Sequence, residues 1–202
     1  MDEYYQVGAM GASFSIGFNS FLNTAINSVG IGIVNNITAK NSVAIGVRNT
    51  VSGESGTAIG GWKNTASGAY SFTSGMMNEA QGSSSIALGQ LNIASGRASI
   101  ALGWNSIANH RAQLVFGTCN IEDSSEAISA QVGNYIEIVG NGINTSARSN
   151  AYALDWSGNG HYMGDVYVGA NADSTGGTKV LCEADFATAQ DIQNIINGGA
   201  GA

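Results

Sequence analysis

Few residues of the chain have types that could carry chemistry, and they lie far apart. The two histidines, His110 and His161, have no Cys, His or Asp at a metal-ligand spacing such as HxxxH or CxxC. Cys119 and Cys182 are isolated from each other, so we expect two free thiols. The sequence therefore predicts no catalytic residue, no cofactor-binding residue and no metal ligand. One alternative stays open, in which a threefold axis gathers three copies of one histidine around a metal ion.

Acidic residues are the next candidates, because glycoside-cleaving proteins use two carboxylates around the scissile bond. Four acids of the first 124 residues fall in or near expected corners of the chain: Glu54, Glu79, Glu122 and Asp123. Asp155 and Asp165 could form a pair, although acids in turns are the simpler interpretation. We therefore expect that the protein is not an enzyme.

Tryptophan side chains are the best candidates for contact with a receptor, since their large amphipathic rings favour interfaces. Trp62 lies in a one-residue insertion, and Trp104 directly follows a repeated glycine. We expect Trp62 and Trp104 to bind the receptor, for instance by stacking on sugars. The alternative is that each covers a corner of the fold. Trp156 lies in an expected hairpin, where we expect it to pack at a chain junction.

The composition limits the kind of fold that positions these side chains. Glycine accounts for 29 of 202 residues and proline for none, which excludes a collagen helix. Charged residues make up 10% and apolar residues 44%, the reverse of a disordered chain. Seven basic residues against 14 acidic ones argue against nucleic acid and anionic membranes as partners. No apolar run reaches the roughly 18 residues of a membrane span, and residues 1–5 show no signal-peptide pattern.

A short phrase that ends in glycine recurs through the first 124 residues. Its glycines are 14 or 15 residues apart, and the phrases are Phe14–Gly17, Val29–Gly32, Val43–Gly46, Thr57–Gly60, Phe72–Gly75, Ile86–Gly89, Ile100–Gly103 and Leu114–Gly117. Three residues after the glycine an asparagine recurs, as Asn35, Asn49, Asn78, Asn92 and Asn120. A fixed period of this kind predicts stacked coils, each of which buries its apolar face against its neighbours.

Each repeat predicts a strand, a corner, a second short strand and another corner. Alternation of large and small residues marks the strand, while Asn and Gly suit the left-handed backbone of tight corners. We expect the large residues to form one buried column, which includes Val43, Ile45, Leu88 and Leu102. The small residues between them would then let a second backbone approach, so that identical rods associate, most simply as three. The alternative is that the small residues fill a narrow part of each coil.

The phrase Ser42–Gly46 with its following Asn49 resembles the head repeat of trimeric autotransporter adhesins. The resemblance covers residues 12–124, and it implies a left-handed parallel β-roll with two identical chains as partners. The sequence departs from that pattern at three places. Residues 60–64 carry one extra residue, expected as a bulge, Ser74 replaces an aliphatic residue, and Asn105 is shifted by one position.

The residues after the repeats follow another pattern. Strand-forming runs at 133–142, 147–160 and 162–169 are separated by Asn-Gly and Ser-Gly signals, which predicts hairpins in a β-rich module over 125–183. Residues 148–169 resemble a module of bacteriophage tail fibres. Residues 184–202 predict a short helix with a flexible end, where apolar residues follow helical spacing.

Together these patterns predict an all-β protein. We expect a short N-terminal segment (1–11), a homotrimeric left-handed parallel β-roll of 14-residue coils (12–124), a small β-hairpin region and a short C-terminal helix. The leading hypothesis is a structural fibre of a bacteriophage virion. Such a fibre would assemble in the host cytoplasm with other virion proteins and attach to a carbohydrate or protein receptor on the bacterial surface, without nucleic acid or membrane insertion.

Two other functions stay open at this point. One is a fragment of a bacterial trimeric autotransporter adhesin, located at the cell surface and binding a host surface or matrix. The other is a carbohydrate-active tailspike. Release of reducing sugars would support the tailspike, and neighbouring virion genes would support the phage fibre.

Overall fold

The computed structural model describes residues 13–17, 21–22, 26–126, 132–164, 166–168 and 178–180. Outside them lie Asp165, Cys182, the expected N-terminal segment 1–11 and the expected helix at 184–202. The chain divides into two compact units, 1–161 and 162–202. No helix long and apolar enough to cross a membrane occurs in the part of the chain that is described.

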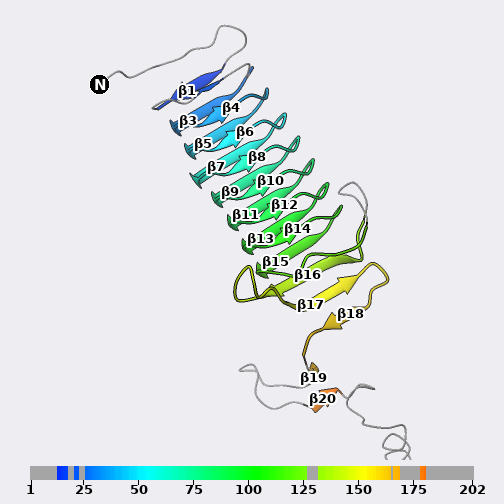
Figure 1. The fold of residues 1–202 in the computed structure, drawn as a ribbon. Helices are drawn as coiled ribbons and strands as arrows, with labels where there is room; N and C mark the ends of the chain where they lie inside the picture. Colours follow the sequence, from blue (N-terminus) through cyan, green and yellow to red (C-terminus); the bar gives the residue numbers. More distant parts are fainter. Residues whose placement is uncertain are drawn as a thin grey trace, which may run out of the picture. The chain divides into compact units, whose positions relative to one another are not determined.

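The repeats fold into a parallel β-solenoid built from two sheets (Figure 1). The long sheet stacks one strand of each repeat: β1 (Phe14–Ile16), β3 (Val29–Ile33), β5 (Val43–Val47), β7 (Thr57–Trp62), β9 (Phe72–Met76), β11 (Ile86–Gln90), β13 (Ile100–Trp104) and β15 (Leu114–Thr118). The short sheet stacks the second strands: β2 (Phe21–Leu22), β4 (Asn36–Ile37), β6 (Thr50–Val51), β8 (Thr65–Ala66), β10 (Glu79–Ala80), β12 (Ile93–Ala94) and β14 (Ile107–Ala108). The sequence-based prediction of an all-β fold with stacked 14-residue coils is thus confirmed, with about seven turns.

Small side chains fill the interior of the solenoid. Ala87 and Ala101 of the long sheet are fully buried, and they cluster with Ala80, Ala94 and Ala108 of the short sheet. The two sheets are joined by corners as short as two residues, so most interior positions hold alanine, and the larger Ile37, Val51 and Val115 are buried toward the two ends of the stack. The alternative in which small residues fill a narrow coil is therefore the correct one.

The large residues of each phrase lie on the other side of the long sheet. Leu88 and Leu102 pair in register, as do Ile31 and Ile45, and all of them stay partly exposed in the single chain. The expected buried column of large residues, which also included Val43, is therefore wrong. The alternation was predicted correctly, but the two faces were exchanged.

A glycine column follows the long-sheet strands because neighbouring coils leave no room there for a side chain. A Cβ atom on Gly89 would collide with the carbonyl oxygen of Gly103, and one on Gly103 with that of Gly117. The φ angles of Gly89 and Gly103, +118° and +111°, are also values that L side chains rarely adopt. In the fourth phrase, which carries the extra residue, Gly61 rather than Gly60 makes this close approach, since a Cβ atom on Gly60 would meet only the Ser74 hydroxyl at 3.8 Å.

The extra residue in the fourth phrase forms the expected bulge. Ile45 pairs with Ile59, whereas Val47 pairs with Trp62, so β7 holds one more residue between these pairs than β5 does. Ser74 keeps the regular register, since it pairs with Ile59 on one side and with Leu88 on the other.

Buried asparagines form a ladder along the two-residue corner. The side-chain amide of Asn78 donates to the carbonyl oxygens of Ser74 (2.9 Å) and Gly89 (2.7 Å), and its oxygen accepts the N–H of Asn92 (3.1 Å). The residue before each of these asparagines has the left-handed backbone, as Met77 does with φ +54°. The expectation that the asparagine itself supplies this backbone is wrong here, because its hydrogen bonds are what the position requires.

Ser106 takes the ladder position near the end of the solenoid, which accounts for the shifted asparagine. Its N–H donates to Oδ1 of Asn92 (2.8 Å), and its hydroxyl lies 3.1 Å from the carbonyl oxygen of Leu102 and 3.3 Å from that of Gly117. A hydroxyl has one proton, so it donates to only one of these oxygens at a time. Asn105 adopts the left-handed corner conformation instead, with φ +54°.

The long sheet continues beyond the repeats. Strand β16 (Tyr135–Asn141) pairs in parallel with β15, β17 (Asn150–Asp155) pairs with β16 in antiparallel fashion, and β18 (Gly160–Tyr162) follows at the sheet edge. In the second unit, β19 (Val166–Val168) pairs antiparallel with β20 (Thr178–Val180). Antiparallel strands after the solenoid were expected, and β16 and β17 provide them.

Candidate functional site

The outer side of the long sheet presents uncharged side chains along every coil, and we call this surface the outer face. Strand pairing places in its first row Phe14, Val29, Val43, Thr57, Phe72, Ile86, Ile100 and Leu114. The second row holds Ile16, Ile31, Ile45, Ile59, Ser74, Leu88, Leu102 and Phe116. Soluble monomers rarely expose a contiguous apolar area larger than roughly a few hundred Å². The outer face is therefore a candidate protein interface.

A third row runs along the ends of the same strands and contains both tryptophans expected to bind a receptor. Its members are Ile33, Val47, Trp62, Met76, Gln90, Trp104 and Thr118. Trp62 and Trp104 are three coils apart, about 14 Å at the usual strand spacing. The Lys63 ammonium lies 4.4 Å from the Trp62 ring centroid, a cation–π distance. The role of these tryptophans in receptor binding stays a prediction.

The acids that could have formed a catalytic pair take separate positions. Glu54 makes an exposed ion pair with Lys40 (3.0 Å), Glu79 accepts a side-chain hydrogen bond (2.7 Å), and Glu122 is exposed. Asp123 is buried and accepts two backbone N–H groups. The described residues also contain no group of three or more His, Cys, Asp or Glu that could hold a metal ion.

His110 and Asp123 form a buried polar cluster at the second corner of the last coil, with side chains 3% and 0% exposed. His110 Nε2 lies 3.2 Å from the hydroxyl of Ser125 and 3.9 Å from the Asp123 carboxylate. That carboxylate accepts the N–H groups of Ser125 and Tyr135, each at 3.0 Å. A Ser-His-Asp triad uses opposite ring nitrogens for serine and acid. Here the Ser125 hydroxyl and the Asp123 carboxylate both lie near Nε2 of His110, so the cluster does not have the geometry of a triad. We therefore assign it a structural role, as a cap at this corner of the solenoid.

Arg148 closes the asparagine corner at the same end of the solenoid. Its guanidinium donates to the carbonyl oxygens of Asn105 (3.1 Å) and Asn120 (3.0 Å) and to Oδ1 of Asn105 (2.9 Å). Asn105 and Asn120 belong to the asparagine corners of two successive coils, so Arg148 links these coils. The loop between β16 and β17 thus ends the solenoid with a charged side chain.

A second polar cluster lies in the turn between β17 and β18. The Asp155 carboxylate accepts the N–H groups of Ser157 (2.8 Å) and Asn159 (2.9 Å) and the side-chain amide of Asn159 (2.9 Å), and it lies 3.2 Å from Nε2 of His161. These hydrogen bonds, above all the one from the Asn159 side chain, hold the pKa of Asp155 well below its ordinary value. The expected partner Asp165 lies outside the described residues.

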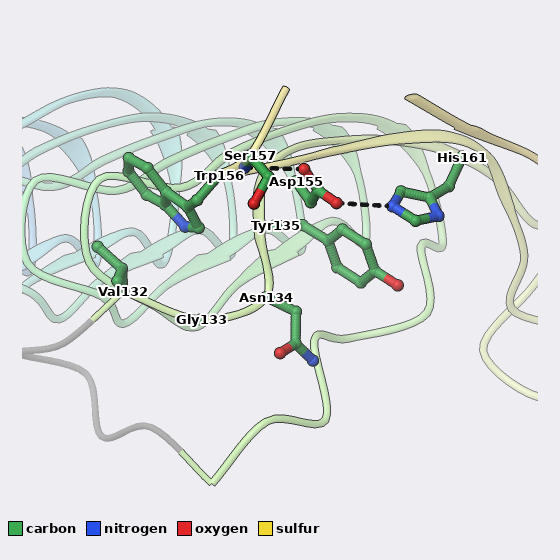
Figure 2. Close-up of a pocket in the computed structure, with 8 residues that line it drawn as sticks. All are labelled: Val132, Gly133, Asn134, Tyr135, Asp155, Trp156, Ser157 and His161. Atoms are coloured by element: carbon green, nitrogen blue, oxygen red, sulfur yellow. Dashed lines mark hydrogen bonds and ion pairs between the residues drawn. The ribbon is translucent and has the colours of Figure 1, made fainter. Parts of the chain in front are cut away.

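An open pocket of about 430 Å³ adjoins this turn, and we call it the turn pocket (Figure 2). It is lined by Val132, Gly133, Asn134, Tyr135, Asp155, Trp156, Ser157 and His161. Trp156, expected to pack at a chain junction, is 43% exposed. The repeat pattern does not predict this pocket, because β16 and the β17–β18 turn belong to no repeat. The signal that could have suggested it was an aromatic residue inside a tight Asp-x-Ser-Gly-Asn turn.

Comparison with protein families supports part of this description. The model of the YadA head domain repeat matches two stretches of the chain, residues 38–61 and 80–106. Over these residues the chain is similar to structural, non-enzymatic adhesin repeats that form β-rolls, as in trimeric autotransporter adhesins. No match was found among curated proteins. The resemblance of the repeats to adhesin heads is thus confirmed, whereas the resemblance of 148–169 to phage fibres gains no support.

Proposed function

We propose that the chain is a head-like module of a homotrimeric adhesive fibre and that the outer face joins its three copies. The observation that carries the proposal is the unbroken series of uncharged, partly exposed side chains along eight strands of the long sheet. The first charged residue in the first row is Glu137, which follows Leu114 where the repeats end. The YadA-like repeats support the same conclusion.

Repetition would make this interface stable. Each partly exposed aliphatic side chain, such as Ile45, Leu88 or Leu102, contributes about 1 kcal/mol when its remaining surface leaves water. Association costs about 4–15 kcal/mol in lost translational and rotational freedom. The first two rows together therefore suffice, and no single contact has to dominate.

The trimer would attach to a surface through several weak contacts at once. Three identical chains display each exposed side chain three times, so repeated receptor groups are bound with higher avidity than one group alone. Trp62 and Trp104 are the proposed receptor contacts, because they lie in the third row, at the edge of the outer face. The matched repeats are non-enzymatic, which favours binding over cleavage.

We place the fibre on a bacterial cell surface, because the supported resemblance is to autotransporter adhesin repeats. The virion fibre is the competing proposal and depends on residues 148–169. Antibodies against the purified chain, applied to intact cells and to purified phage particles of the same source, distinguish the two. Labelled cells would support the adhesin, and labelled particles would replace it with the virion fibre.

Light scattering tests the trimer. The full chain should have three times the 20.6 kDa mass of one chain. A monomer at micromolar concentration would overturn the proposal. The double variant Trp62→Ala and Trp104→Ala should remain trimeric but bind receptor-bearing cells more weakly. Dissociation of that variant would instead assign the two indole rings to the interface.

A further inference from the structure

The turn pocket combines an exposed aromatic ring with uncharged polar groups. Trp156 and Val132 are 43% and 45% exposed, and they lie toward one side of the opening, with Asn134 and Tyr135 toward the other (Figure 2). The Tyr135 ring meets His161 edge-on, with centroids 5.5 Å apart. From this arrangement we propose that the turn pocket binds a neutral saccharide, a function separate from the outer face.

The turn that carries Trp156 is held in place before any ligand arrives. The Asp155 N–H donates to the carbonyl oxygen of Asn159 (3.0 Å), and the Gly158 N–H donates to that of Asp155 (3.1 Å). The Asp155 carboxylate adds three more hydrogen bonds inside the turn. A ligand that stacks on the indole ring therefore pays little conformational entropy for ordering the loop.

The charges of the pocket favour a ligand without net charge. Asp155 is the sole carboxylate among the described lining residues, and its oxygens are engaged by the turn and by His161. The remaining polar side-chain groups of the lining are the Asn134 amide, the hydroxyls of Ser157 and Tyr135 and the indole N–H of Trp156, all of them uncharged. These uncharged donors and acceptors suit hydroxyl groups. Since glycoside cleavage uses two carboxylates, the pocket is suited to binding.

The size of the pocket fits a single sugar unit at the end of a glycan. A volume of about 430 Å³ lies within the usual range for small-molecule sites, about 300–1,000 Å³, while the open side leaves room for the rest of a chain. A sugar presents an apolar C–H face and a polar hydroxyl edge. The C–H face matches the exposed indole ring of Trp156, and the hydroxyl edge matches the amide and hydroxyl groups of the pocket.

Titration of the full chain with simple glycosides tests this site. The probes are the methyl glycosides of glucose, galactose, N-acetylglucosamine and sialic acid, observed by saturation-transfer NMR and by calorimetry. At least one neutral glycoside should bind with a dissociation constant of about 1 mM, while the anionic sialoside binds more weakly. Trp156→Ala and Asn134→Ala should each weaken binding by about tenfold or more. Tyr70→Ala removes an exposed aromatic ring that lines neither the turn pocket nor the proposed receptor contacts, so it is the matched control and should leave binding unchanged.

Three outcomes would overturn the saccharide site. These are the absence of binding by every neutral glycoside, binding that survives both Trp156→Ala and Asn134→Ala, and preferential binding of the sialoside. Light scattering on Trp156→Ala keeps this test apart from the proposed function. If Trp156→Ala remains trimeric but binds no sugar, the substitution has affected the turn pocket and not the interface between chains. If the wild-type chain is monomeric and still binds sugar, only the proposed trimer is contradicted.

Discussion

Arg148 is tied to Asn105, 43 residues earlier in the chain, by two hydrogen bonds of 3.1 and 2.9 Å to its backbone and side-chain oxygens. A solenoid needs a terminal element of this kind, because its last coil would otherwise leave polar groups without a partner. Arg148 provides it at the asparagine corner, and the His110–Asp123 cluster provides it at the other corner.

Replacing Arg148 should therefore loosen the end of the solenoid before the rest. We expect Arg148→Ala to cost about 2 kcal/mol, since charged hydrogen bonds to partly buried groups are lost. Hydrogen exchange should accelerate in β16 and β17 and not in β5 or β7. Arg97→Ala, at an exposed arginine, is the control. Equal effects of the two substitutions would show that Arg148 does not act as a cap.

Two adjacent residues of β11, Ala87 and Leu88, lie on opposite sides of the long sheet. Ala87 is fully buried inside the solenoid, whereas Leu88 lies on the outer face. Leu88→Asp should dissociate the trimer yet leave each chain folded. Ala87→Asp places a carboxylate in the closed interior and should cost several kcal/mol, with loss of the β signal in circular dichroism. Light scattering measures the first effect. An unfolded Leu88→Asp chain, or a stable Ala87→Asp chain, would contradict the assignment of the two faces.

This pair of residues also shows how far the sequence could lead. Alternation of period 2 predicts a strand, but it says nothing about which of the two faces is inside. The width of the solenoid decides which face is inside. That width depends on corners such as Leu91–Asn92, and the hydrogen bonds that hold such a corner cannot be read from the sequence. The repeats could be found because they recur. The turn pocket could not, since Tyr135 and Trp156 come from parts of the chain that no repeat relates.

Different substitutions in the asparagine ladder should lower the stability of the protein by different amounts. Asn78→Ala removes the donor for the carbonyl oxygens of Ser74 and Gly89 and the acceptor for the N–H of Asn92. Since buried polar groups are then left without a partner, we expect a loss of about 3 kcal/mol in chemical denaturation. Asn78→Ser should cost less, because Ser106 already occupies a ladder position. If Ser proved as damaging as Ala, the hydroxyl would not replace the amide there.

The stability of the turn that contains Asp155 should depend on pH in the acidic range. Its pKa lies below the ordinary value of about 3.9, because the Asn159 side chain and two N–H groups favour the charged form. The contribution to stability is therefore complete above that ordinary value, and it is lost as the pH falls toward the lowered pKa. NMR titration of the Asp155 carboxyl measures this pKa directly. Asn159→Ala should raise it, and a midpoint near 4 in the wild-type chain would contradict the hydrogen-bonded turn.

Thr73 breaks the alanine column of the long sheet, and its removal should stabilise the protein. It pairs in register with Ala58 and Ala87, is fully buried, and lies between the two apolar clusters of the interior. Among the described residues, its hydroxyl oxygen has no hydrogen-bond partner. Thr73→Val keeps the branched shape but removes the unsatisfied hydroxyl, so we expect a gain of about 1–2 kcal/mol. Thermal unfolding should then shift upward by about 2–4 °C per kcal/mol. Thr57→Val, on the partly exposed outer face, is the control and should change the folding stability of the single chain little. A lower melting temperature for Thr73→Val would mean that the hydroxyl is satisfied inside the solenoid.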